Sequence, residues 1–164
     1  MIPFDEGMWR IELLHPPLVH FPIAFLLLGT GLELLSLVVR QGRRAYLRTT
    51  SLLLFTLGVI GAWLAVWSGG EAEHIVNRVL CDPTVTEAHE EWATAVSWIF
   101  TGVLVLAALR RRIARPGLVT VIVVLGAIAG SIGLTYVGHL GASLVYQQGA
   151  AVRQPSADCR EFAE

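Results

Sequence analysis

Four long apolar stretches divide the chain, and polar residues gather in the short segments between them. The stretches cover residues 18–39, 50–69, 90–110 and 117–140. Each is close to the roughly 17–25 residues that a helix needs to cross the hydrocarbon core of a bilayer. Backbone N–H and C=O groups find no water in that core, so segments of this kind must satisfy them internally as helices. The pattern therefore predicts four transmembrane helices.

The connections between these stretches are short, which favours neighbouring helices that run in opposite directions. We therefore expect an all-α integral membrane protein, folded as an antiparallel four-helix bundle. Residues 1–152 form this domain, and residues 153–164 form a short polar tail. The second and fourth helices are expected to continue past the membrane, toward Val79 and Tyr146.

Prolines indicate where two of the helices begin. The first helix is expected to open after His15-Pro16-Pro17, because proline costs little in a first helical turn, where N–H groups have no helical partner. This places His15 just outside the helix. Asp82 and Pro83 form a typical N-cap and first-turn pair for the third helix.

The composition agrees with a membrane location. Of the 164 residues, 54% are hydrophobic and 15% are charged, against about 45–50% and about 25% in soluble domains. These values exclude a soluble enzyme, a disordered tail and a nucleic-acid-binding domain.

The charges are distributed unevenly. All 12 basic residues are arginines, and eight of them lie at 40–48 and 110–115, where there is no acidic residue. Twelve of the 13 acidic residues lie in the two termini, in the central loop or at the first two positions of the third stretch. By the positive-inside rule, the arginine segments are cytoplasmic. We expect a bacterial inner-membrane protein with both termini in the periplasm.

Cys81 lies in the central loop and Cys159 in the final tail, both on the predicted outer side. Disulfides persist in that compartment, so the sequence favours a Cys81–Cys159 disulfide. Two free thiols are the alternative.

The five histidines all fall at the predicted outer ends of the helices. Neutral imidazole is a common ligand for haem iron and transition metals in helix bundles. His20 and His89 lie near helix N-termini, where the partial positive charge favours the neutral ring. His139 is flanked by glycine on one side, which permits close approach. These three are the candidate cofactor ligands, and a metal site without porphyrin would add His74 and Glu71. Hydrogen bonding to neighbouring helices or water is the simpler alternative.

Glu33 is the one acidic residue in the interior of an apolar stretch, away from its ends. A carboxyl group in a membrane is costly and usually faces other helices. It either handles protons or pairs with an arginine that reaches in from a cytoplasmic loop.

The fourth stretch contains Gly126-xxx-Gly130, a pattern that lets helices approach closely. Tight packing within the chain is favoured over a dimer interface.

The motif His15-Pro-Pro-Leu-Val-His20-Phe-Pro-Ile-Ala24 resembles the opening of the bacterial multi-pass membrane proteins known as Domain of Unknown Function 2231. In that family an acidic residue commonly follows in the first span, and a histidine commonly opens the third. Glu33 and His89 hold those positions here. Residues 141–152 are similar to the family's closing motif, although Gln148 stands where a histidine is often found. The resemblance covers about residues 16–152, and it implies four spans without implying a reaction.

Three functions are compatible with these patterns. The first is binding of b-type haem for electron transfer with a periplasmic or membrane redox partner. The second is binding or sensing of copper, zinc or iron by histidines. The third is a cofactor-free accessory subunit of a larger membrane complex. The lipid bilayer is the expected partner in every case and nucleic acid in none, while enzymatic activity and a homodimer stay open.

Overall fold

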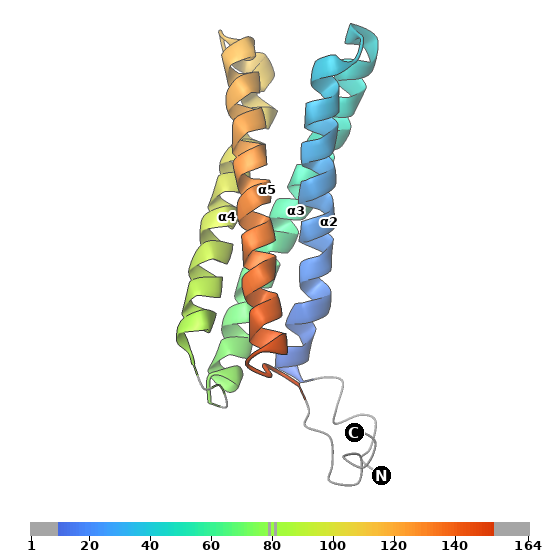
Figure 1. Ribbon diagram of the computed structural model, residues 1–164. Helices are drawn as coiled ribbons and strands as arrows, with labels where there is room; N and C mark the ends of the chain where they lie inside the picture. Colours follow the sequence, from blue (N-terminus) through green and yellow to red (C-terminus); the bar gives the residue numbers. More distant parts are fainter. Residues whose placement is uncertain (1–9, 79, 81, 153–164) are drawn as a thin grey trace.

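The computed structural model describes residues 10–78, 80 and 82–152 of the chain. It contains four long α-helices, and a short 3₁₀-helix, η1 (Arg110–Arg112), follows the third of them (Figure 1). The long helices are α2 (Ile11–Val38), α3 (Gln41–Val76), α4 (Thr84–Leu109) and α5 (Pro116–Tyr146). All four are long and apolar enough to cross a membrane. The all-α prediction with four helices of membrane-spanning length is therefore confirmed.

The helices extend well beyond the apolar stretches of the sequence. α3 has 36 residues, which corresponds to about 54 Å at 1.5 Å per residue, against a hydrocarbon core of about 30 Å. It begins at Gln41, so Arg43, Arg44 and Arg48 belong to its first turns instead of a loop. Arginine is a good helix former, and its long side chain reaches polar surroundings from a helix end.

The expected start of the first helix was wrong. α2 begins at Ile11, and His15, Pro16 and Pro17 all lie inside it, as does Pro22. A membrane helix tolerates prolines where neighbouring helices and side chains compensate for the lost N–H groups. His15 is therefore a helical residue, and the helix determines the direction of its side chain.

Glycine makes room for one of these prolines. A methyl group added at Gly61 of α3 would lie 3.2 Å from Pro22 Cδ. The absence of a side chain at Gly61 thus allows α3 to pass close to Pro22 of α2.

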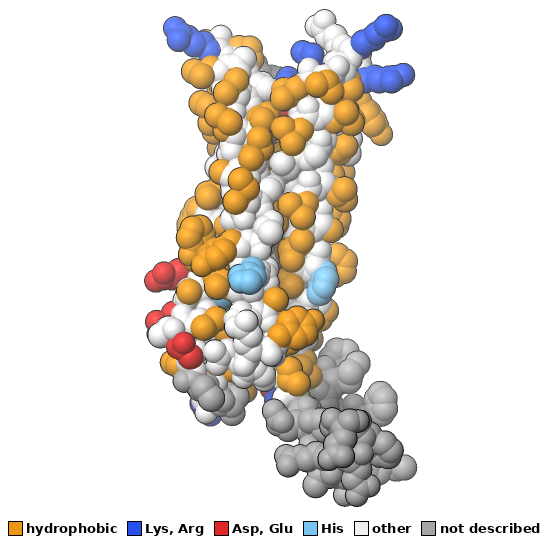
Figure 2. All heavy atoms as spheres, in the orientation of Figure 1, with side chains coloured by type: hydrophobic (Ala, Val, Ile, Leu, Met, Phe, Trp, Pro, Cys, Tyr) orange, Lys and Arg blue, Asp and Glu red, His pale blue; other side chains and the backbone are white. Residues whose placement is uncertain are grey.

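Each helix runs back alongside the one before it (Figure 1). Contacts join α2 to α3, α3 to α4, α4 to α5 and α5 to α2; they are most extensive within the pairs α2–α3 and α4–α5 and sparse between α5 and α2. This cyclic order places α2 and α4 on one diagonal. The arrangement has an arginine end, with the α2–α3 connection and η1, and a histidine end, where α2 begins and α5 finishes. Figure 2 shows basic side chains at the first and acidic and histidine side chains near the second.

The centre of the molecule is apolar and tightly packed. Leu26, Phe55, Phe100 and Val123 come from the four different helices and are fully buried. The rings of Phe55 and Phe100 have their centroids 6.1 Å apart. These contacts hold the helices in register between the two polar ends.

Three glycines in the middle of α5, Gly126, Gly130 and Gly133, face α4. A methyl group added at Gly130 would lie 2.8 Å from the Phe100 ring, and one at Gly126 would lie 2.9 Å from Val103. Real Cβ atoms essentially never make contacts this short. The Gly126–Gly130 pattern therefore serves packing within the chain, as the sequence favoured.

Candidate histidine site between α2 and α4

Two histidines from diagonally opposed helices meet at the histidine end. The ring centroids of His15 on α2 and His89 on α4 lie 6.2 Å apart, and the ring planes are nearly perpendicular at 84°. Ligand sites in helix bundles are built in the same way, from side chains that project inward from facing helices. The pair is the natural candidate for a functional site.

The tautomer of His89 follows from its hydrogen bond. Its Nδ1 lies 3.1 Å from the backbone carbonyl oxygen of Val137 on α5. A carbonyl oxygen only accepts, so Nδ1 must carry the hydrogen. In the neutral ring, Nε2 then holds the free lone pair. This is how metal-binding histidines are commonly oriented, with the second nitrogen hydrogen-bonded to a carbonyl.

The tautomer of His15 follows from its hydrogen bond in the same way. Its Nδ1 lies 3.1 Å from the hydroxyl oxygen of Ser68 on α3. The Ser68 hydroxyl donates its own hydrogen to the carbonyl of Ala65, at 3.1 Å. Ser68 is therefore left to accept from His15, which puts the hydrogen on Nδ1 and the lone pair on Nε2. Both rings thus offer Nε2 as a ligand atom.

Two glycines complete the site from the other two helices. A methyl group added at Gly69 of α3 would lie 3.1 Å from Cε1 of His15, and one at Gly141 of α5 would lie 3.2 Å from Cε1 of His89. Such contacts are tighter than nine in ten real Cβ contacts. All four helices therefore shape the space around the two rings.

The other candidate ligands lie elsewhere on the surface. His20 is exposed on α2, where its Nδ1 lies 2.6 Å from the carbonyl oxygen of Pro16. His139, His74 and Glu71 are also exposed. Within the described residues, no group of three or more histidine, cysteine, aspartate or glutamate side chains could share a metal ion. Of the candidates, only His89 lies against another histidine ring, and that ring is His15.

Sequence reasoning missed His15 because the two prolines after it suggested a helix start. A signal was nevertheless present. His15 and Glu33 are 18 residues apart, which is about five turns of an α-helix. Residues five turns apart lie on the same face of a helix. A helix extended back from Glu33 would therefore have placed His15 on the face that points into the bundle.

Polar side chains make several hydrogen bonds in the described part of the connection between α3 and α4. The side chain of Asn77 donates to Glu73 at 2.9 Å and accepts from the Thr86 hydroxyl at 2.7 Å. Asp82 accepts hydrogen bonds from the hydroxyl and backbone N–H of Thr84, and these hold the pKa of its carboxyl below the ordinary value. The N-cap of α4 is Pro83, so the predicted assignment of Asp82 as N-cap and Pro83 as a first-turn residue was wrong by one position, and Asp82 instead binds Thr84 from just outside the helix.

Cys81 and Cys159 lie outside the described residues. The disulfide between them stays a prediction.

A second polar pair joins the same diagonal helices at the arginine end. Arg110 follows α4 directly and binds the buried carboxylate of Glu33 with two hydrogen bonds, the longer of them 3.3 Å. Arg48 of α3 lies 3.8 Å from the same carboxylate. The structure thus pairs Glu33 with an arginine, while a role in proton handling stays a prediction.

These features define a class: a multi-pass membrane protein whose four apolar helices enclose a polar pair near each end. Within that class, the chain belongs to the family described as Predicted membrane protein (DUF2231), which matches it over residues 12–154. The resemblance seen in the sequence is thereby confirmed. No curated protein and no solved structure matches the chain.

Proposed function

We propose that this protein binds b-type haem through His15 and His89 and exchanges electrons with a redox partner at its periplasmic face. The observation that carries the proposal is the meeting of these two rings between α2 and α4, each with its Nε2 lone pair available. The spacing supports it, because two imidazoles on opposite sides of one metal have their ring centres about 6 Å apart, given metal–nitrogen bonds of about 2 Å.

Haem suits this ligand set better than a bare metal ion. The porphyrin supplies four nitrogens, so the protein needs to add only two axial ligands. A structural zinc site needs four protein ligands, and no such group exists in the part of the chain that the structure describes. A histidine pair is therefore sufficient for haem and insufficient for structural zinc.

The surroundings of the pair also favour haem. Val137 and Ser68 fix the orientation of the two imidazoles and increase their basicity as ligands. Gly69 and Gly141 keep side chains away from both rings. A macrocycle would lie between the helix pairs α2–α3 and α4–α5, whose mutual contacts are the looser ones.

The proposal includes a topology. The arginine end lies in the cytoplasm, and the histidine end, with both termini, lies in the periplasm of a bacterial inner membrane. Support comes from the eight arginines in segments 40–48 and 110–115. The haem then lies at the outer membrane boundary, within reach of a membrane or periplasmic redox partner.

A copper or iron ion without porphyrin is the second candidate. The His15–His89 pair would supply two nitrogens, and water or a partner protein would supply the rest. Haem absorbance separates the two candidates, since a bare ion gives none.

Hemin titration of purified variants tests the proposal. The full chain, purified in detergent, is titrated with hemin while the Soret absorbance is followed. We expect saturation at one haem per chain for the wild type. His15→Ala and His89→Ala should each lose the saturable absorbance.

His20→Ala and His139→Ala are the matched controls, because both side chains are exposed. His20 lies on α2, like His15, and His139 lies on α5, which packs against α4. Both should bind like the wild type. Loss of binding in these two, with His15→Ala unaffected, would transfer the site to the surface histidines. Failure of the wild type to saturate, without bound metal in elemental analysis, would favour a cofactor-free accessory subunit.

A further inference from the structure

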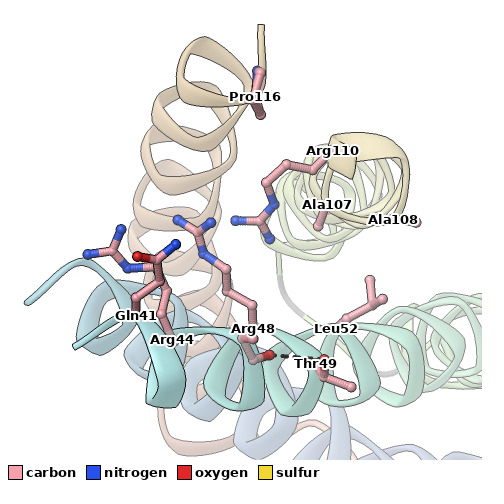
Figure 3. A pocket seen from close by; sticks show the side chains of 10 residues that line it. Gln41, Arg44, Arg48, Thr49, Leu52, Ala107, Ala108, Arg110 and Pro116 are labelled. Atoms are coloured by element: carbon pink, nitrogen blue, oxygen red, sulfur yellow. Dashed lines mark hydrogen bonds between the residues drawn. The ribbon is translucent and has the colours of Figure 1, made fainter. Parts of the chain in front are cut away.

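A basic pocket opens at the arginine end, far from the histidine pair. Its volume is about 480 Å³, and it lies between the start of α3, the end of α4 with η1 and the start of α5 (Figure 3). Arg44, Arg48 and Arg110 supply its charged wall, while the apolar wall includes Leu52, Ala107 and Pro116.

The positive charge of this pocket exceeds its negative charge. Figure 3 shows the guanidinium groups of Arg48 and Arg110 pointing toward one another. The carboxylate of Glu33 neutralises one charge, since it binds Arg110 and lies 3.8 Å from Arg48. The Nε of Arg48 donates to the hydroxyl of Ser36 at 3.2 Å, which adds no negative charge. Two positive charges are left among the three arginines.

Arg44 has an unsatisfied donor in addition. One of its terminal nitrogens contacts the backbone carbonyls of Leu37 and Val39, at 3.5 and 3.4 Å. Its Nε is buried and has no hydrogen-bond partner among the described residues. A buried donor without an acceptor is destabilising. An oxygen-rich anion in the pocket would offset the excess positive charge.

We propose that the pocket binds a phosphate group, held by Arg44, Arg48 and Arg110. The planar guanidinium group matches two phosphate oxygens at once, which makes arginine the preferred phosphate ligand. The group belongs to an anionic phospholipid or to a soluble phosphate. Lipid is favoured by the apolar wall, which would accept the glycerol and upper acyl chains, and by the headgroup depth of the arginine end.

Thermal unfolding of the detergent-purified full chain, followed by tryptophan fluorescence, measures binding. The titrants are dioctanoyl phosphatidylglycerol, dioctanoylglycerol and inorganic phosphate. We expect saturable stabilisation by phosphatidylglycerol and none by dioctanoylglycerol, which lacks phosphate. Saturation by inorganic phosphate to the same extent would assign the site to a soluble phosphate. Absence of stabilisation by both phosphate-bearing titrants would overturn the proposal.

Variants distinguish binding in this pocket from a general electrostatic effect of the arginines. The double change Arg44→Gln with Arg48→Gln should weaken the apparent affinity for phosphatidylglycerol about tenfold. The matched control, Arg40→Gln with Arg43→Gln, removes the same charge from exposed positions nearby and should bind like the wild type. Equal weakening in both doubles would refute a specific site. Arg44→Gln alone, which leaves the contacts of Glu33 intact, should show several-fold weakening and serves if the double variant does not fold.

Discussion

Glu33 and Arg110 pair across the diagonal that His15 and His89 bridge at the opposite end. The two pairs are 18 residues apart along α2 and 21 residues apart along α4 and the first residue of η1, which corresponds to about 27 Å and about 32 Å. The hydrocarbon core of a bilayer is about 30 Å thick. The apolar region between the two polar pairs is therefore about as long as the hydrocarbon core is thick. Each pair then lies near one boundary of that core.

Loss of the Glu33 carboxylate should destabilise the protein strongly. Glu33→Gln leaves the buried guanidinium of Arg110 without its counter-charge, and breaking a buried ion pair from one side costs about 3–5 kcal/mol. Unfolding in mixed detergent micelles, followed by circular dichroism, measures the change.

The double variant Glu33→Leu with Arg110→Leu should recover much of that loss, because it removes both charges. Arg112→Gln at an exposed position should change the free energy of unfolding by less than about 0.5 kcal/mol. Equal stability of Glu33→Gln and the wild type would show that the ion pair contributes nothing.

Close packing of α5 on α4 predicts opposite effects for two glycines. Gly130→Ala introduces a methyl group 2.8 Å from Phe100 and should destabilise by about 1–3 kcal/mol. Gly102→Ala on α4 meets nothing within 4 Å and should be neutral or stabilise by up to about 1 kcal/mol, as alanine favours helix. The same unfolding assay compares them, and a stabilising Gly130→Ala would mean that α5 packs differently.

Glycines beside the histidine pair should control haem affinity. Gly69→Ala and Gly141→Ala crowd the rings of His15 and His89, whereas Gly70→Ala and Gly138→Ala meet nothing within 4 Å. We expect the first two variants to bind hemin at least several-fold more weakly and the second two to bind like the wild type. Identical titration curves for all four would indicate that haem, if bound, does not lie beside these glycines.

The proposed topology predicts one-sided labelling of the two ends. In a variant with both natural cysteines replaced by serine, Gln147→Cys should react with a membrane-impermeant maleimide in intact spheroplasts. Gly42→Cys should react only after the membrane is permeabilised. Both positions are exposed, so access depends on the side of the membrane, and the reverse pattern would invert the topology.

The sequence predicted the helices well because the apolar stretches and the arginine segments carry strong, local signals. The partner of Glu33 was predictable only as an arginine, since the choice of Arg110 depends on how η1 follows α4. His15 was misplaced because a local rule about proline outweighed the five-turn spacing to Glu33. Its pairing with His89 required the diagonal placement of α2 and α4, which a single sequence does not specify.

The absorption spectrum of the protein, purified in detergent from haem-replete bacteria, decides whether the histidine pair holds haem. Haem ligated by His15 and His89 predicts a Soret band that shifts on dithionite reduction, and the band should be absent from His15→Ala and His89→Ala. A colourless wild-type preparation that stays unchanged on addition of hemin would contradict haem binding.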